Sequence, residues 1–161
     1  MATLTASRAA STFPVGGYAG AGVLNVAYGS YTLATNPTAA DVIQFCKLPA
    51  GAVVIGGLLR GEDLDTGTEE LDIDIGWAAN GGTGVGATAD PDGFGNFGVI
   101  TGDAVTELKP EVSIYLPLNG TLKSGPVSFD AETMIQGVVN VDAATGGTGV
   151  IWLQVYYLLN S

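Results

Sequence analysis

Apolar and polar residues alternate with a period of two in several segments, which is the pattern of a β-strand with one buried face. The clearest case is residues 71–77, where four apolar side chains fall on one face and Asp72 and Asp74 on the other. Strands are also predicted at 41–48, 52–59, 134–141 and 150–159, with weaker candidates at 24–33, 111–116 and 126–129. About seven to nine strands in one chain indicate an all-β protein.

The last predicted strand, residues 150–159, is apolar on both of its faces. One face would carry Ile151, Leu153, Val155, Tyr157 and Leu159, and the other Val150, Trp152, Tyr156 and Leu158. In an antiparallel β-sandwich, only one face of a strand meets the partner sheet. The second face must therefore be covered by a loop, by the N-terminal arm or by another chain, and we predict Trp152, Tyr156 and Leu158 at an intersubunit contact.

Charged residues are too few to cover a solitary particle. They make up 13% of the chain, whereas 47% is hydrophobic, and a soluble domain usually has about 25% charged residues. Part of the surface is therefore expected to be buried against other subunits, most simply in a homo-oligomer. The length of 161 residues predicts a single domain.

The first 29 residues contain one charge, Arg8, and scattered aromatic residues. We interpret residues 1–29 as an extended N-terminal arm and residues 30–161 as the sandwich domain. Phe13 and Val15 in the arm are predicted to contact a neighbouring subunit, because arm exchange joins protomers at low cost.

Turn chemistry predicts the connections. Leu-Pro-Ala-Gly at 48–51 indicates a hairpin between its flanking strands. The Gly-rich stretch 78–98 is predicted to be a long loop. Residues 102–109 fit a two-turn helix with Asp103 as N-cap, a loop or a short strand.

Composition excludes many functions. The chain has no histidine and one cysteine, so Ser-His and Cys-His nucleophilic pairs, His-containing metal sites and intrachain disulfides are impossible. A net charge of −11 opposes nucleic-acid binding. No apolar run approaches the roughly 20 residues that span a bilayer, and no secretory signal pattern opens the chain, so synthesis and use from the cytoplasm are expected.

Three stretches could hold an ion. Residues 81–88 resemble a phosphate-binding loop but lack its Gly-Lys-Ser/Thr ending, so a flexible hairpin loop is favoured. Residues 90–96 place oxygen side chains at spacings that could suit calcium, but an Asp-Pro-Asp-Gly turn is favoured. The acidic stretch from Glu62 to Asp74 could bind a divalent ion or a basic partner, although a solvated loop and strand face is the simpler interpretation.

No catalytic, cofactor or metal site is predicted. Trp77 and Trp152 lie on strand patterns, where a core tryptophan is more common than a sugar-stacking platform. Lys123 and Ser124 are adjacent, so their side chains would point apart in an extended chain, and Cys46 fits a small core residue.

Several segments together resemble the decoration, or cement, proteins of tailed bacteriophage heads. They are residues 41–54, Gly-Glu-Asp-Leu-Asp-Thr-Gly at 61–67, Leu-Asp-Ile-Asp-Ile-Gly-Trp at 71–77, residues 89–94 and the apolar closing strand. The resemblance implies a β-sandwich, jelly-roll-like, often trimeric, bound outside the capsid where major capsid subunits meet. A structural, non-enzymatic virion protein made in the host cytoplasm is therefore expected, with itself and the major capsid protein as partners.

The acidic net charge agrees with a place on the outside of a capsid. Acidic protein is tolerated on the outer face of a DNA-filled shell, whereas packaged phosphate would repel it inside. Two alternatives remain: a carbohydrate- or receptor-binding tail or fibre module, which requires exposed aromatics such as Phe94, Phe97 or Tyr18, and a carboxylate-based glycosidase, which requires two acids converging in a pocket.

Overall fold

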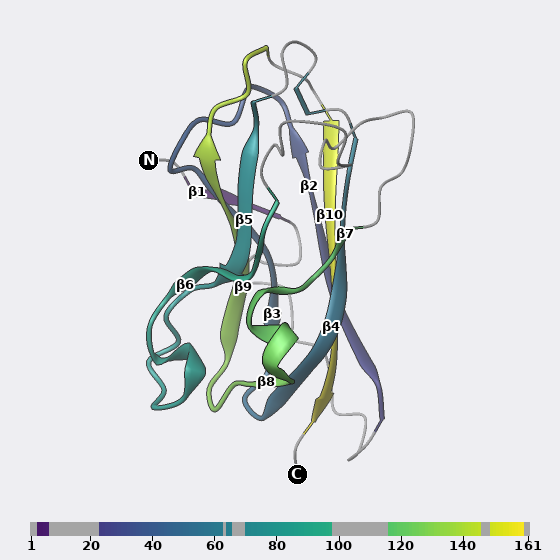
Figure 1. Ribbon diagram of the computed structural model, residues 1–161, viewed down its shortest axis with the longest axis vertical. Coiled ribbons are helices and arrows are strands. Elements are labelled where there is room, and N and C mark those ends of the chain that lie inside the picture. The colour runs from purple at the N-terminus through teal and green to yellow at the C-terminus, as the bar shows by residue number, and fades with distance from the viewer. Residues whose placement is uncertain are drawn as a thin grey trace.

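The computed structural model describes residues 3–6, 23–62, 64–65, 70–97, 116–145 and 149–159. Its strands form two layers that pack face to face (Figure 1). Sheet A has the order β1-β3-β9-β5-β6, and sheet B has the order β2-β10-β4-β7, with β8 also pairing with β4. The strands are β1 Thr3–Thr5, β2 Asn25–Leu33, β3 Val42–Leu48, β4 Ala52–Gly61, β5 Asp72–Trp77, β6 Asp90–Asn96, β7 Leu116–Pro117, β8 Val127–Ser128, β9 Thr133–Val141 and β10 Gly149–Leu159.

The predicted antiparallel β-sandwich is confirmed. Apart from the parallel β1–β3 pair, the strands pair antiparallel. Without β1 and the short β8, the sheet orders are β3-β9-β5-β6 and β2-β10-β4-β7, and the chain crosses repeatedly between the sheets. This order is compatible with the jelly-roll-like sandwich that we expect.

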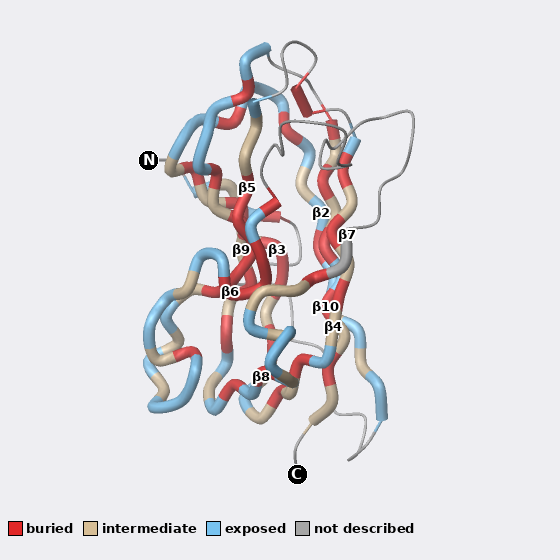
Figure 2. Tube along the Cα trace, in the orientation of Figure 1, coloured by how far each residue is buried: buried red, intermediate tan, exposed pale blue. Residues whose placement is uncertain are grey.

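The core lies between the layers and is built from the inward side chains of both sheets. Strand β10, in the middle of sheet B, buries Ile151, Leu153, Val155 and Tyr157. In sheet A, the Trp77 ring packs edge to face on Phe94 and Phe129, with ring centroids 5.0 and 5.3 Å apart. Burial of each large side chain contributes about 1.5–3 kcal/mol. Buried positions run along both layers, and exposed ones gather at the two ends (Figure 2).

The hairpin predicted around residues 48–51 is wrong. Strand β3 belongs to sheet A and β4 to sheet B, so the turn carries the chain across the sandwich. Gly51 has φ 82, and its N–H donates to the Phe129 carbonyl at 2.8 Å. Both strands have a fully buried apolar face, and crossing between layers lets those faces pack against each other.

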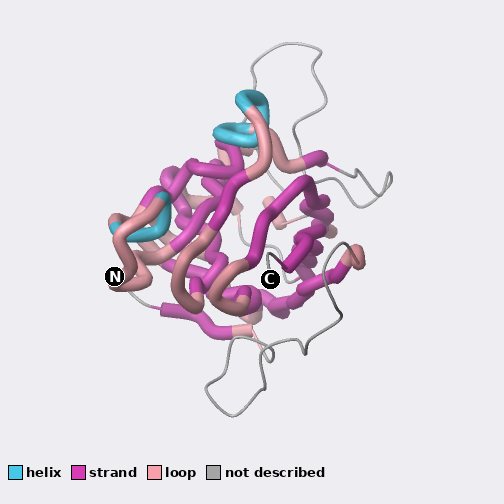
Figure 3. The backbone as a smooth tube through the Cα atoms, turned by 90° about the horizontal axis from the view of Figure 1, so that it is seen from below, coloured by secondary structure: helices cyan, strands magenta, loops and turns pink. Residues whose placement is uncertain are grey.

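The long loop predicted at 78–98 is wrong in its second half. Residues 78–89 do connect neighbouring antiparallel strands and contain the 3-10 turn η2, Val85–Ala87, but 90–96 form β6. Pro91 is tolerated because β6 is an edge strand, where one side of the backbone needs no partner. A Cβ at Gly93 would lie 2.2 Å from the Trp77 ring, so only glycine lets β6 cross the indole. Seen from below, η2 and the second 3-10 turn, η3 (Gly120–Ser124), lie at the periphery (Figure 3).

The predicted arm is described only in part. Strand β1 adds to sheet A beside β3, and β2 begins at Asn25, so residues 25–29 belong to sheet B. Phe13 and Val15 lie outside the described residues, as do 102–109 and 111–115. The arm therefore stays a prediction.

Candidate interface on the outer face of sheet B

The outer face of sheet B is formed by β10 with β2 and β4 on either side. Side chains of β10 alternate between the core and this face, so Trp152, Tyr156 and Leu158 point outward and are half-buried. The three residues of this strand that were predicted for the interface therefore lie on one surface, separate from the core. Their role in a contact between subunits is a proposal.

Strand register places side chains of two further strands on the same face. Tyr28 of β2 and Leu58 of β4 flank Gln154 of β10, and Val26 flanks Tyr156. Val26 and Tyr28 are 49% and 48% exposed. An apolar and aromatic surface thus extends across three strands, and such patches mark contact sites when they are large.

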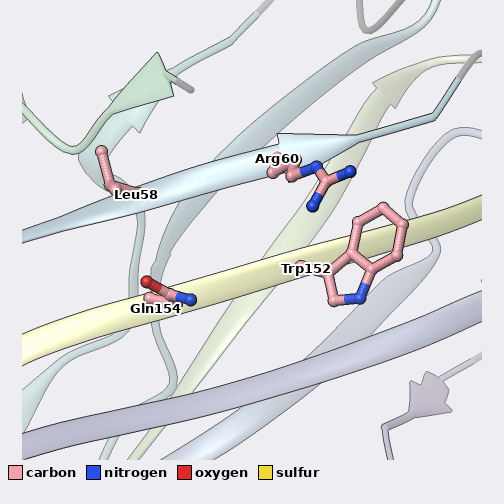
Figure 4. A pocket seen from close by; sticks show the side chains of 4 residues that line it. All are labelled: Leu58, Arg60, Trp152 and Gln154. Atoms are coloured by element: carbon pink, nitrogen blue, oxygen red, sulfur yellow. The ribbon is translucent and has the colours of Figure 1, made fainter. Parts of the chain in front are cut away.

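A shallow groove of about 100 Å³ lies on this face, lined by Leu58, Arg60, Trp152 and Gln154. The guanidinium carbon of Arg60 is 4.7 Å from the centroid of the Trp152 ring (Figure 4). The Tyr156 hydroxyl donates to Gln154 Oε1 at 3.2 Å. In Figure 4 the amide nitrogen of Gln154 lies on the side toward Trp152, so the groove presents hydrogen-bond donors.

Sequence reasoning missed Arg60 and Gln154 as parts of this surface. Alternation along 52–61 could have placed Arg60 on the outward face of β4. Only the register between β4 and β10, which sets Arg60 beside Trp152, brings the groove together.

The outer side of sheet A differs in charge. Strands β5 and β6 carry Asp72, Asp74, Asp90 and Asp92. Burial, the largest influence, raises the pKa of Asp74; a hydrogen bond with Asn140 opposes this, and the charges of Asp72 and Asp92 raise it further. Burial and the neighbouring Asp92 also raise the pKa of Asp90.

These acids do not form a recognisable metal site. Within the described ranges, no three His, Cys, Asp or Glu side chains are grouped so that they could hold a metal ion. The Asp-Pro-Asp-Gly sequence is strand rather than the turn we expect. The calcium interpretation of 90–96 therefore gains no support from the geometry.

The Gly-rich loop after β5 does bind an anionic group, but that group is the side-chain carboxylate of Asp130. Asp130 Oδ2 accepts hydrogen bonds from the Thr83 N–H at 2.7 Å, the Thr83 hydroxyl at 2.9 Å and the Gly84 N–H at 2.8 Å. The Thr83 donors are the main reason that the pKa of Asp130 lies below its usual value. The amides that a phosphate would need here are occupied by a carboxylate.

Asp65, in the acidic stretch, has a structural role. It is 5% exposed, and its Oδ2 accepts from the N–H groups of Glu70 at 2.9 Å, Leu71 at 3.2 Å and Ala144 at 3.0 Å. Its Oδ1 accepts from the Thr145 N–H at 3.1 Å. This acid ties two loops together instead of facing solvent, whereas Asp63 and Glu69 lie outside the described residues.

The aromatic residues singled out for the carbohydrate- or receptor-binding alternative are not exposed where the structure describes them. Phe94 and Phe97 are buried, and Tyr18 lies outside the described residues. The groove on sheet B has no carboxylate among its lining residues. Trp77 and Cys46 are buried in the core as expected, and Lys123 and Ser124 lie in η3.

No helix in the described ranges combines the length and apolarity needed to cross a membrane. No family model and no curated protein matches the chain.

Solved structures do match it. A chain of the cyanophage Pam1 capsid asymmetric unit is 25% identical with a TM-score of 0.66, over 93% of this chain and 94% of that chain. A chain of the capsid of Ralstonia phage GP4 is 20% identical with a TM-score of 0.76, over 99% of both chains. The fold is that of phage capsid chains. A chain of the acidic stable capsid of Helicobacter pylori bacteriophage KHP30 also matches, at 15% identity and a TM-score of 0.60, over 88% of this chain and 91% of that chain.

Proposed function

We propose that this chain is a structural virion protein that binds the outer surface of a phage capsid and stabilises contacts between major capsid subunits. The observation that carries the proposal is the match to phage capsid chains over nearly the whole of each chain.

The surface of the sandwich supports a binding role rather than catalysis. The strands of sheet B expose apolar and aromatic side chains outward, and Arg60 is the one charged residue among β2, β4 and β10. Trp and Arg are common among the residues that dominate the free energy of protein–protein contacts. Burial of this face against a neighbouring subunit would remove few charges from water, because the acids of β5 and β6 belong to the other sheet.

We also propose that copies of the chain associate, most simply as a trimer. Trp152, Tyr156 and Leu158 would form the contact, with Phe13 and Val15 of the arm lying on a neighbour. Apolar burial across the contact would contribute about 25 cal/mol per Å². Added across capsomer boundaries, this free energy would oppose the internal pressure of packaged DNA.

The proposal is tested on purified virions of the phage that encodes the chain. Mass spectrometry and cryo-microscopy should find the chain at many copies on the outside of the head. Heads that lack it should lose DNA at a lower temperature than complete heads. A few copies confined to the tail tip would instead favour the carbohydrate- or receptor-binding module, and absence from virions would reject both.

A further inference from the structure

We infer that strand β2 pairs with β2 of a second copy, antiparallel and centred on Val26, so that sheet B continues across a two-fold axis. This contact lies at the edge of sheet B, whereas the contact proposed at Trp152 lies on its outer face. Neither contact requires the other. Where both form, the edge contact would join one oligomer to the next.

The start of β2, with the two residues before it, concentrates exposed apolar surface. Val23, Leu24, Val26 and Tyr28 are each about half exposed. They make up four of the seven large hydrophobic residues that are exposed in the described part of the chain. Tyr28 also interacts within its own chain, and its exposed half remains beside that interaction. Figure 2 shows this end of β2 as largely exposed. Such clustering of apolar side chains is typical of a contact site.

The other edge strands are protected against further pairing. Strands β1, β7 and β8 have only three, two and two residues. Strand β6 carries Asp90, Pro91 and Asp92, and its Phe94 carbonyl accepts a hydrogen bond from the Asn119 N–H at 2.8 Å. Short length, charge, proline and a covering loop each hinder the addition of another strand.

Strand β2 lacks the protection that is built into those sequences. It has nine residues, none of them charged and none proline, and its register with β10 runs from Asn25 to Leu33 without a bulge. Within the described ranges it pairs with β10 alone. The backbone N–H and C=O groups along its other side can therefore bind a further strand.

Self-complementarity identifies the occupant as a second copy. The side chains at even positions of β2 point outward. An antiparallel pair centred on Val26 places Val26 opposite itself and Leu24 opposite Tyr28 of the second copy. Three apolar cross-strand pairs then share the outer face, each contributing to the stability of the sheet. Residues 24–28 of the two copies would also form about four to six backbone hydrogen bonds.

Charge makes this strand a favourable meeting point for two copies. Each copy has a net charge of −11, so most approaches between copies bring acids together. Residues 23–33 contain neither an acid nor a base, so no charged side chain of the strand faces its own equivalent across the axis. A two-fold contact of this kind uses the same surface of both copies.

The first test is a disulfide at the centre of the pair. In Val26→Cys, the two Cα atoms would lie about 4.5–5.5 Å apart, which a disulfide can bridge. We therefore expect a covalent dimer after mild oxidation, detected by denaturing electrophoresis without reductant. The unaltered chain controls for Cys46, which is buried and should not link copies.

Ser30→Cys is the matched control. Ser30 is exposed on the same face of the same strand, but it lies four residues from the proposed centre. Its equivalents in the two copies would be roughly 26 Å apart, so this variant should form little dimer.

The register is tested with a mixture of Leu24→Cys and Tyr28→Cys. The two cysteines would lie opposite each other, so oxidation of the mixture should give a dimer that contains both variants, whereas either variant alone should link poorly. Val26→Lys would place two ammonium groups opposite each other, which destabilises a strand pair. Sedimentation equilibrium should show association weakened at least tenfold relative to Ser30→Lys.

Several results would overturn the inference. They are equal linking of Val26→Cys and Ser30→Cys, no mixed dimer of Leu24→Cys with Tyr28→Cys, and equal association of the two lysine variants. A link from Val26→Cys to the major capsid protein on phage heads, in place of a second copy, would also overturn it. Trp152→Glu tests the outer-face contact separately. If the chain is absent from virions but Val26→Cys still links copies, the proposed function fails and this inference stands.

Discussion

The outer faces of the two sheets differ sharply in charge, although both belong to one small sandwich. Strands β5 and β6 of sheet A carry four aspartates, at 72, 74, 90 and 92. Strands β2, β4 and β10 of sheet B carry Arg60 as their one charged residue. In a chain of net charge −11, three neighbouring strands without an acid form a surface that other copies or a capsid can approach with least repulsion.

Exposed apolar strand residues are more numerous in sheet B, although Val141 of β9 in sheet A is also 44% exposed. Val26, Tyr28 and Ile55 are 49%, 48% and 45% exposed, and all belong to strands of sheet B. Charge placement, rather than the apolar content shared by both sheets, therefore distinguishes the proposed contact face of sheet B from the acidic strands of sheet A. Substitutions on sheet A and on sheet B can test this difference.

The largest expected effect is that of Trp152→Glu, which places a charge at the centre of the apolar face. We expect the dissociation constant of the oligomer to rise at least about 100-fold, equivalent to roughly 3 kcal/mol. Val141→Glu is the matched control, because Val141 is 44% exposed at the end of β9 in sheet A. Analytical ultracentrifugation measures both. If the Trp152 variant stays assembled, the sheet B face is not the contact.

The next largest effect is expected on the free energy of unfolding, when the buried acid Asp65 is replaced. Asp65→Asn replaces a carboxylate oxygen with an NH₂ group that faces backbone N–H donors, so we expect the free energy of unfolding to fall by about 2–4 kcal/mol. Urea denaturation measures the loss. Asp92→Asn, at an exposed position of β6, should change it by less than about 0.5 kcal/mol. Equal effects of the two substitutions would show that the buried acid contributes no more than an exposed one.

Local patterns predicted much of this structure. Alternation within 150–159 correctly indicated which side chains enter the core and placed Trp152, Tyr156 and Leu158 on one outer face. Alternation within 71–77 correctly placed Ile73, Ile75 and Trp77 in the core, but Asp74 on the opposite face is buried as well. Those inferences hold because the two-residue period of a strand is a property of the strand itself.

Long-range pairing could not be predicted in the same way. Arg60 meets Trp152 through a register between strands about 90 positions apart in sequence, and Asp65 binds amides at 144 and 145. The turn at 48–51 fits either a hairpin or a crossing between sheets, and its local residues do not distinguish them. Residues 90–96 contain turn-forming residues, yet pairing with β5 makes them a strand.

A smaller change in the free energy of unfolding is expected from Asp74, one of the acids of sheet A. Because the pKa of Asp74 is raised from 3.8, the folded protein holds that proton to higher pH than the unfolded chain. Stability from this group therefore falls as pH rises from about 4 through the folded pKa. Asp74→Asn removes that slope and should raise the free energy of unfolding at pH 7 by less than about 1 kcal/mol. Denaturation at several pH values checks it. A variant that keeps the wild-type slope would assign the slope to other groups.

The smallest effect is expected at Asp130, whose pKa is shifted in the opposite direction. Hydrogen bonds from Thr83 and Gly84 favour its ionised form, so its contribution is present above about pH 4 and is lost as pH falls through the lower, folded pKa. Asp130→Asn should leave global unfolding nearly unchanged, because Asp130 is exposed. Hydrogen exchange of the Thr83 and Gly84 amides should become faster at pH 7, with no difference expected in β10. Unchanged exchange would mean that this acid, unlike Asp65, does not hold the backbone around it, and that solvated and structural carboxylates coexist on the acidic side of the sandwich.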